Sequence, residues 1–137
     1  MAALQPFVGT WSCVGGAPGE KPVNATVTYV AESGVLRQCI TMGSQGEVRG
    51  AFAGAFSDDE QKHRYTYAWT DNHGGWGVSV AKPWSGNTIS WTDLSSDDGK
   101  LGRSQDAWTG KDDFVYTRYD TATSATPSFK ASCKRSS

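Results

Sequence analysis

Three charged residues have the types and spacing for proton transfer or for orienting a polar ligand. Asp106 alternates in step with Trp108, so both side chains point to the same side of their segment. Arg118 is in step with Phe114 in the same way. A buried charge is costly unless it is paired, so we expect Asp106 to pair with Arg118 or with Arg37. These three residues are the catalytic candidates, and the alternative is that they lie on an outer face in water.

Aromatic side chains form a second set, on the apolar faces of neighbouring segments. Its members are Tyr65, Tyr67, Trp69, Trp76, Trp91, Trp108 and Tyr116. Aromatic walls with a few polar groups are typical of pockets for apolar ligands. Tyr and Trp also carry an O–H or N–H group that needs a partner when buried. We therefore interpret this set, with Arg37 and Arg118, as a ligand-binding wall, and the alternative is that the rings fill a core.

The histidines and cysteines give weaker signals. With two histidines, three cysteines and no Cys-x-x-Cys pair, no metal site is expected. His73 lies near Asp71 and two glycines, but no Ser or Cys nucleophile motif accompanies it, so this segment is better interpreted as a wide hairpin. Neither His63 nor His73 is placed as an axial haem ligand, and no motif implies a cofactor.

Short strands must position these side chains. The chain contains 16 glycines and 6 tryptophans in 137 residues, a composition typical of an all-β domain with an aromatic interior. Turn signals recur about every ten residues, the spacing of a meander or barrel. We expect strands at residues 9–14, 22–31, 35–42, 48–56, 62–70, 76–81, 88–93, 103–109, 114–119 and 128–134.

Each expected strand carries one apolar face, and no helix is available to cover it. Such strands close most economically on themselves, so we predict an all-β fold, an antiparallel up-and-down β-barrel of about ten strands without a helical lid. A two-sheet sandwich is the alternative. Five aromatic residues are expected to point into the barrel: Tyr65, Tyr67, Trp69, Trp91 and Trp108. We expect one domain over residues 1–137, with flexible ends at 1–5 and 135–137.

Charge and hydropathy exclude several classes of partner. The formal net charge is −1, so there is no overall attraction to nucleic acid or to anionic lipid. No stretch approaches the roughly 18 unbroken apolar residues of a membrane-spanning helix. The first residues, MAALQPF, lack a basic segment followed by an apolar run, so we expect no signal peptide within the sequence as given.

The start of the chain resembles the calycin barrels, the lipocalins and fatty-acid-binding proteins, at residues 7–11, FVGTW. This resemblance implies that Trp11 closes one end of a barrel. Residues 9–13 (GTWSC), 71–77 (DNHGGWG), 84–91 (WSGNTISW) and 132–135 (SCKR) are similar to small exported bacterial calycin-like proteins of unknown function. The chain departs from the fatty-acid-binding proteins, since it lacks their helix–turn–helix lid and the Arg-x-Tyr of their last strand. Their way of binding a carboxylate is therefore not expected.

A disulfide between Cys13 and Cys133 is expected. In a closed meander the first and last strands are neighbours, because only their pairing removes both free edges. The calycin-like ends also place these two cysteines on adjoining strands, and Cys39 stays free. A disulfide implies an oxidising compartment, so we expect a periplasmic or extracellular protein. The alternative is three buried thiols.

Three functional hypotheses follow. The first is a monomeric or weakly dimeric barrel that binds a small apolar or aromatic molecule, with neither nucleic acid nor a membrane as partner. The second is a cofactor-independent cyclase or isomerase, in which Asp106, Arg37, Arg118 or a Tyr hydroxyl transfers protons or polarises the substrate. The third is a structural or interaction module without a ligand.

Overall fold

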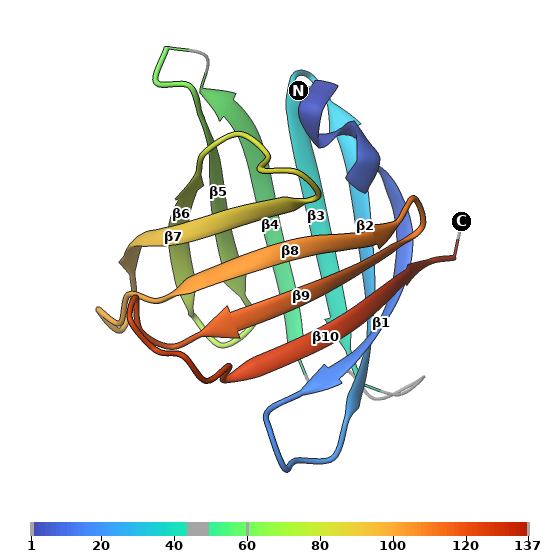
Figure 1. Cartoon of the computed structure of the whole chain (residues 1–137), viewed down its shortest axis with the longest axis vertical. Coiled ribbons are helices and arrows are strands. Elements are labelled where there is room, and N and C mark those ends of the chain that lie inside the picture. The colour runs from blue at the N-terminus through green and yellow to red at the C-terminus, as the bar shows by residue number, and fades with distance from the viewer. Residues whose placement is uncertain (1, 44–49, 60, 137) are drawn as a thin grey trace.

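Ten antiparallel strands close into a barrel in the computed structural model, which describes residues 2–43, 50–59 and 61–136 (Figure 1). A short 3-10 helix, η1 (Ala2–Phe7), precedes the strands β1 (Gly9–Gly16), β2 (Val23–Glu32), β3 (Val35–Met42), β4 (Gly50–Asp59), β5 (Arg64–Asp71), β6 (Trp76–Ala81), β7 (Thr88–Ser96), β8 (Arg103–Gly110), β9 (Asp113–Tyr119) and β10 (Phe129–Arg135). Each strand pairs with its neighbours in sequence, and β1 pairs with β10. The predicted up-and-down barrel is confirmed. Residues 48 and 49, at the start of the fourth expected strand, lie outside the described residues.

Alternation along the strands decides which side chains fill the barrel. On β7, Ile89 and Trp91 are buried and Ser90 between them is exposed, because successive side chains of a strand point to opposite faces. The five aromatic residues expected inside agree with this register. Tyr65 and Trp91 are buried, and Tyr67, Trp69 and Trp108 are half-buried.

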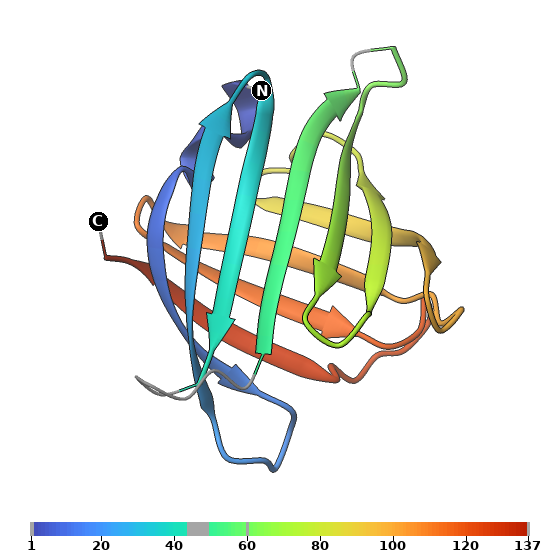
Figure 2. The ribbon, with the colours of Figure 1, turned by 180° about the vertical axis from the view of Figure 1, so that it is seen from behind.

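One end of the barrel is closed by η1 (Figure 2). Leu4 and Trp11 are fully buried there, and Trp11 Nε1 donates a hydrogen bond to the Phe7 carbonyl oxygen at 2.8 Å. The Arg135 guanidinium lies 4.3 Å from the centre of the Trp11 ring and donates to Asp112 Oδ1 at 2.8 Å. Leu4 and Arg135, which belong to the two ends expected to be flexible, are packed into the fold.

A disulfide joins the strands whose pairing closes the barrel. Cys13 of β1 lies directly opposite Cys133 of β10, with the Cα atoms 4.1 Å apart and the sulfur atoms bonded. Cys39 is a free, exposed cysteine on the outer face of β3. Both parts of the cysteine prediction are confirmed.

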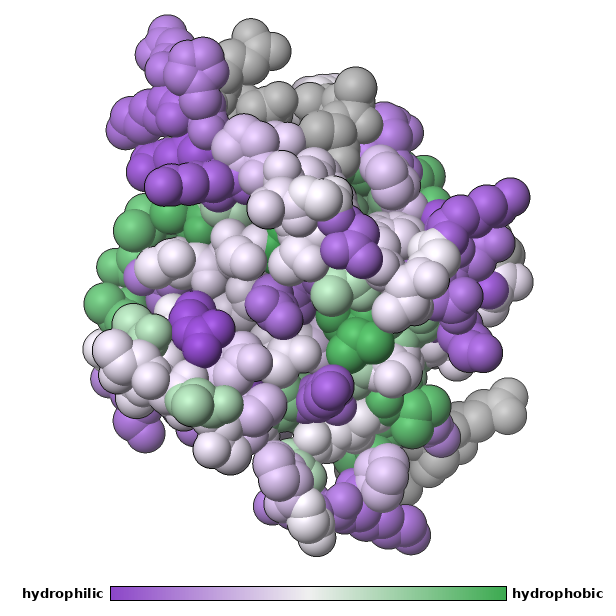
Figure 3. Space-filling model, viewed as in Figure 1, coloured by the Kyte–Doolittle hydropathy of each residue, from purple (hydrophilic) through white to green (hydrophobic). Residues whose placement is uncertain are grey.

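The outer surface of β7 to β10 is mainly polar, with separated hydrophobic side chains (Figure 3). Trp76 belongs to the outer surface of β6, where it is 43% exposed. Placing it in the ligand-binding wall was wrong, because it precedes Gly77, which faces inward. No helix within residues 2–43, 50–59 and 61–136 is long and apolar enough to cross a bilayer.

Candidate functional site

Asp106 lies in the barrel interior on β8, and its side chain is buried. The neighbouring positions are Ile89 of β7 and Tyr116 of β9. Trp91 Nε1 donates a hydrogen bond to Asp106 Oδ2 at 3.2 Å. Burial removes water from the charged form and raises the pKa of Asp106 to about 7, while the Trp91 hydrogen bond acts in the opposite direction. At neutral pH this carboxyl group can therefore either hold or release a proton.

Neither arginine expected to pair with Asp106 does so. Arg37 lies on the outer face of β3, where it forms an exposed ion pair with Glu32. Its proposed role inside the barrel was wrong, because the buried Leu36 and Gln38 occupy the inward positions on either side of it.

Arg118 does lie toward the interior, but its partner is Asp93 of β7. Its two Nη atoms donate to the two carboxylate oxygens at 3.1 and 2.6 Å. Ser79 Oγ and the Gly102 amide also donate to Asp93, each at 2.9 Å. Burial raises the pKa of Asp93, but these donors outweigh it and hold the pKa below its usual value. The Arg118 charge is thus balanced without Asp106.

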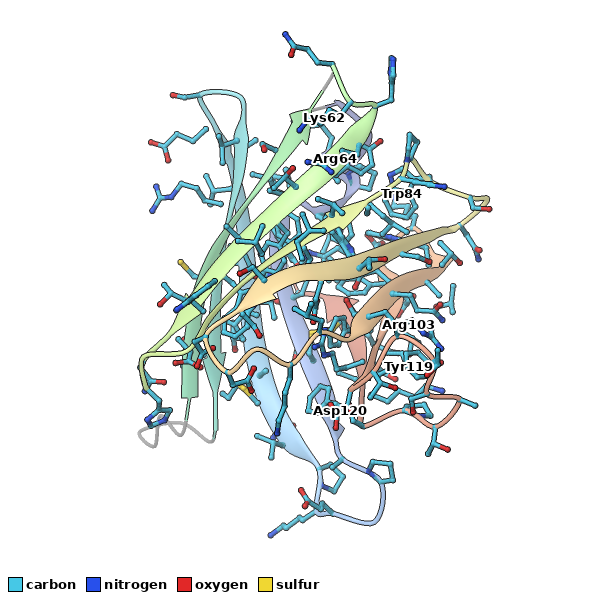
Figure 4. All side chains as sticks on the ribbon, turned by 90° about the vertical axis from the view of Figure 1, so that its left-hand side faces the viewer. Lys62, Arg64, Trp84, Arg103, Tyr119 and Asp120 are labelled. Atoms are coloured by element: carbon cyan, nitrogen blue, oxygen red, sulfur yellow. A yellow bond between two sulfur atoms is a disulfide. The ribbon has the colours of Figure 1, made fainter. Side chains whose placement is uncertain are left out.

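Arg103 of β8 is also held away from Asp106. Its guanidinium lies 3.8 Å from the centre of the Tyr119 ring, and the two side chains lie together in Figure 4. Its Nη2 atom donates to the Ser124 carbonyl oxygen at 2.9 Å. Arg103 therefore does not form an ion pair with Asp106, although both residues belong to β8.

Two tyrosines and a glutamine form a hydrogen-bonded chain across the interior. Gln38 Nε2 donates to Tyr29 Oη at 3.0 Å, and Tyr67 Oη donates to Gln38 Oε1. Burial and the nearby Asp106 raise the pKa of Tyr29, and burial and the Tyr29 phenol raise the pKa of Tyr67. Both phenols are therefore neutral at any physiological pH.

A third phenol completes this region. Burial raises the pKa of Tyr116 to about 12, and its hydroxyl group forms a hydrogen bond with Ser104. Asp106 acts electrostatically on all three phenols, which places the four groups in one region. We call this region, with its hydrogen-bond partners, the central cluster: Tyr29, Gln38, Tyr67, Trp91, Asp106 and Tyr116.

Stacked rings border the central cluster. The rings of Phe56 and Tyr67 stack with centroids 4.0 Å apart and planes 8° from parallel. Trp91 meets these two rings edge to face at 5.3 and 6.0 Å. The site thus combines flat apolar faces with one carboxyl group and several hydroxyl groups.

The remaining aromatic candidates divide between the two ends of the barrel. Trp108 packs against Phe7 of η1 at 5.2 Å, so it belongs to the closed end. Its Nε1 atom is buried and has no hydrogen-bond partner among the described residues. Trp69 lies toward the opposite end, where its indole covers Gly77 and leaves no room for a Cβ atom there.

The loop after β5 is held by its own backbone. Asp71 Oδ1 accepts hydrogen bonds from the amides of His73 and Gly75, each at 2.8 Å. These bonds lower the pKa of Asp71. His73 is exposed, and Gly74 has a positive φ of 84°, as expected for a hairpin.

Sequence reasoning did not single out Tyr29 or Gln38. The signal was present, since Gln38 alternates in step with Leu36 and Ile40, which places Arg37 on the opposite face. A polar residue within an apolar face identifies a buried hydrogen-bonding group. Arg37 itself lies on the outer face of β3, where its charge stays in water.

We expect Asp106 to make stability depend on pH. The carboxyl group titrates at about 4 in an unfolded chain and at about 7 in the barrel, so the folded state binds the proton more tightly. The free energy of unfolding then falls by about 2 kcal/mol from about pH 5 to about pH 8. Urea denaturation at several pH values should show this decline in the natural protein and not in Asp106→Asn. Parallel curves for the two proteins would contradict this expectation.

Comparison with known proteins shows the fold alone. No protein-family model matches the chain, and neither does any curated protein. A de novo designed fluorescence-activating β-barrel is 13% identical, with a TM-score of 0.51 over 98% of each chain. A redesigned β-barrel is 12% identical, with a TM-score of 0.52 over 98% of this chain and 96% of its own.

Proposed function

We propose that the barrel binds a small aromatic or apolar molecule in its interior, between the central cluster and the end away from η1. The observation that carries this proposal is that inward side chains are more deeply buried at one end of the barrel than at the other. At the end closed by η1, the side chains of Leu4, Phe7 and Trp11 are buried. Toward the other end, the inward Ile40 and Trp69 remain half-buried, so part of their apolar surface is still accessible.

The chemistry of these inward surfaces suits an aromatic guest. Tyr67, Trp69 and Trp91 offer ring faces and edges that bury large apolar areas. Gln38, Asp106 and the tyrosine hydroxyls offer polar atoms that fix orientation, and ligand sites generally combine a few such atoms with apolar walls.

An uncharged fluorescent probe tests the proposal. N-phenyl-1-naphthylamine becomes bright in apolar surroundings, and we expect saturable binding with a dissociation constant of about 10 μM or lower. Ile40→Trp places a large ring on the inward face and should weaken binding about tenfold or more. Thr41→Trp adds the same ring to the exposed outer face of the same strand and should leave binding unchanged. Absence of saturable binding, or equal effects of the two variants, would contradict the proposal.

A cofactor-independent cyclase or isomerase is the second candidate function. The observation that favours it is the position of Asp106, which is buried beside three phenols and whose pKa this burial raises to about 7. Molecules retained by protein purified from its source separate the two functions. An isomerase predicts that Asp106→Asn retains a compound of the same mass but different chromatographic retention. A binding protein retains the same compound in both forms.

We also propose a calycin-like relationship and a periplasmic or extracellular location. The relationship is supported by the FVGTW segment, whose Trp11 lies buried beneath η1 at the closed end. The location is supported by the Cys13–Cys133 disulfide, since cytosolic thiols stay reduced. Non-reducing peptide mapping of protein isolated from its source tests the location, and three free thiols would contradict it.

A further inference from the structure

We propose that the central cluster selects a small aromatic cation, a protonated primary amine whose ammonium group binds the Asp106 carboxylate while its ring packs on Tyr67 and Trp91. This inference rests on the proposed function and specifies the ligand class. It is carried by the position of Asp106, a buried carboxyl group that faces phenols and an indole N–H group.

The charges around the cluster favour a cation. Among the described residues, three charged groups act on the Tyr116 phenol: Arg118, Asp106 and Asp93. Arg118 is bound through both Nη atoms to Asp93, so these two charges cancel. The ionised Asp106 is left as the excess charge. A cationic ligand balances it, whereas an anionic ligand adds a second unpaired negative charge.

The hydrogen-bonding groups also match an ammonium group. An ammonium carries three N–H donors and no acceptor. The Asp106 carboxylate and the oxygens of Tyr29 and Tyr116 are acceptors in one region of the interior. Nearby ring faces add cation–π attraction, which strengthens when water is excluded. A neutral alcohol makes fewer of these contacts, and a carboxylate meets repulsion from Asp106.

Without such a ligand, burial favours the protonated form of the Asp106 carboxyl group. Binding of an ammonium ion must then displace this proton. At neutral pH Asp106 is about half protonated, so binding releases about half a proton for each amine bound. A neutral ligand with the same ring releases none.

Three compounds with the same phenyl ring test the inference by calorimetry at about pH 8: 2-phenylethylamine, 2-phenylethanol and phenylacetate. We expect the amine to bind about tenfold more tightly than the alcohol, and the acid to bind most weakly. Asp106→Asn should abolish the preference for the amine. Asp113→Asn is the matched control, since it removes the same charge from a half-exposed residue on the outer face of β9.

Proton release provides a measurement that needs no variant. Titrations of the natural protein at about pH 7 in phosphate and in Tris should differ for the amine and agree for the alcohol, because the two buffers take up protons with different enthalpies. Equal affinities for amine and alcohol, tighter binding of the acid, or no proton release overturns the cation inference. If N-phenyl-1-naphthylamine still binds, the proposed function stands. If neither the probe nor any phenyl compound binds, both fail.

Discussion

Replacing Cys13 and Cys133 together with alanine should lower the free energy of unfolding by about 3–5 kcal/mol. The disulfide spans a sequence separation of 120 residues, so it restricts a large loop in the unfolded chain. For a loop of this length, the chain-entropy model gives about 5 kcal/mol. In the folded state the bond also joins β1 to β10, whose pairing closes the barrel. Urea denaturation under non-reducing conditions measures the loss.

Cys39→Ala is the matched control for this double variant. Its thiol is exposed on the outer face of β3 and forms no disulfide, so the change should shift stability by less than about 1 kcal/mol. A reducing agent should destabilise the natural protein and Cys39→Ala, and should leave the double variant unaffected. A natural protein equally stable with and without reductant would contradict the expectation.

Trp11→Ala should destabilise the barrel by about 3–5 kcal/mol. The Trp11 ring is fully buried and contacts the rings of Trp108 and Phe114 at 5.4 and 4.8 Å. Its indole N–H group also holds the Phe7 carbonyl oxygen, and thus the end of η1. Removing the side chain leaves a cavity and breaks this hydrogen bond together. The denaturation midpoint and slope in urea measure the effect.

Trp76→Ala removes the same side chain from the outer surface and serves as the control. Trp76 is 43% exposed, so its truncation should cost less than about 1 kcal/mol. Similar losses for both variants would show that Trp11 does not anchor the closed end. Because both variants remove a tryptophan, a difference in stability between them reports the effect of burial and not of residue type.

Burial of the interior could be predicted in part from periodicity. The alternation of β7 identified Ile89 and Trp91 as inward, and both are buried. On β3 the same rule predicts that Gln38 points inward. Arg37 was instead proposed as the interior polar residue, and it lies on the outer face. Alternation assigns a side chain to a face, and a charged residue is the more reliable indicator of the outer one unless a partner is known. Gln38 is stable inside because two tyrosine hydroxyls satisfy its amide.

By itself, the sequence predicted the strands, most of their faces, the closed barrel and the disulfide, because these depend on period-two alternation and on the order of strands along the chain. Only the tertiary structure decided which charged groups meet. Asp93 and Asp106 both lie on the inward face with Arg118, but only Asp93 forms the ion pair. The stagger of neighbouring strands sets the level of each side chain in the barrel, and alternation carries no information about level. Among the described residues, the same stagger leaves Asp106 beside phenols and not beside a cation, and its proposed function follows from this arrangement.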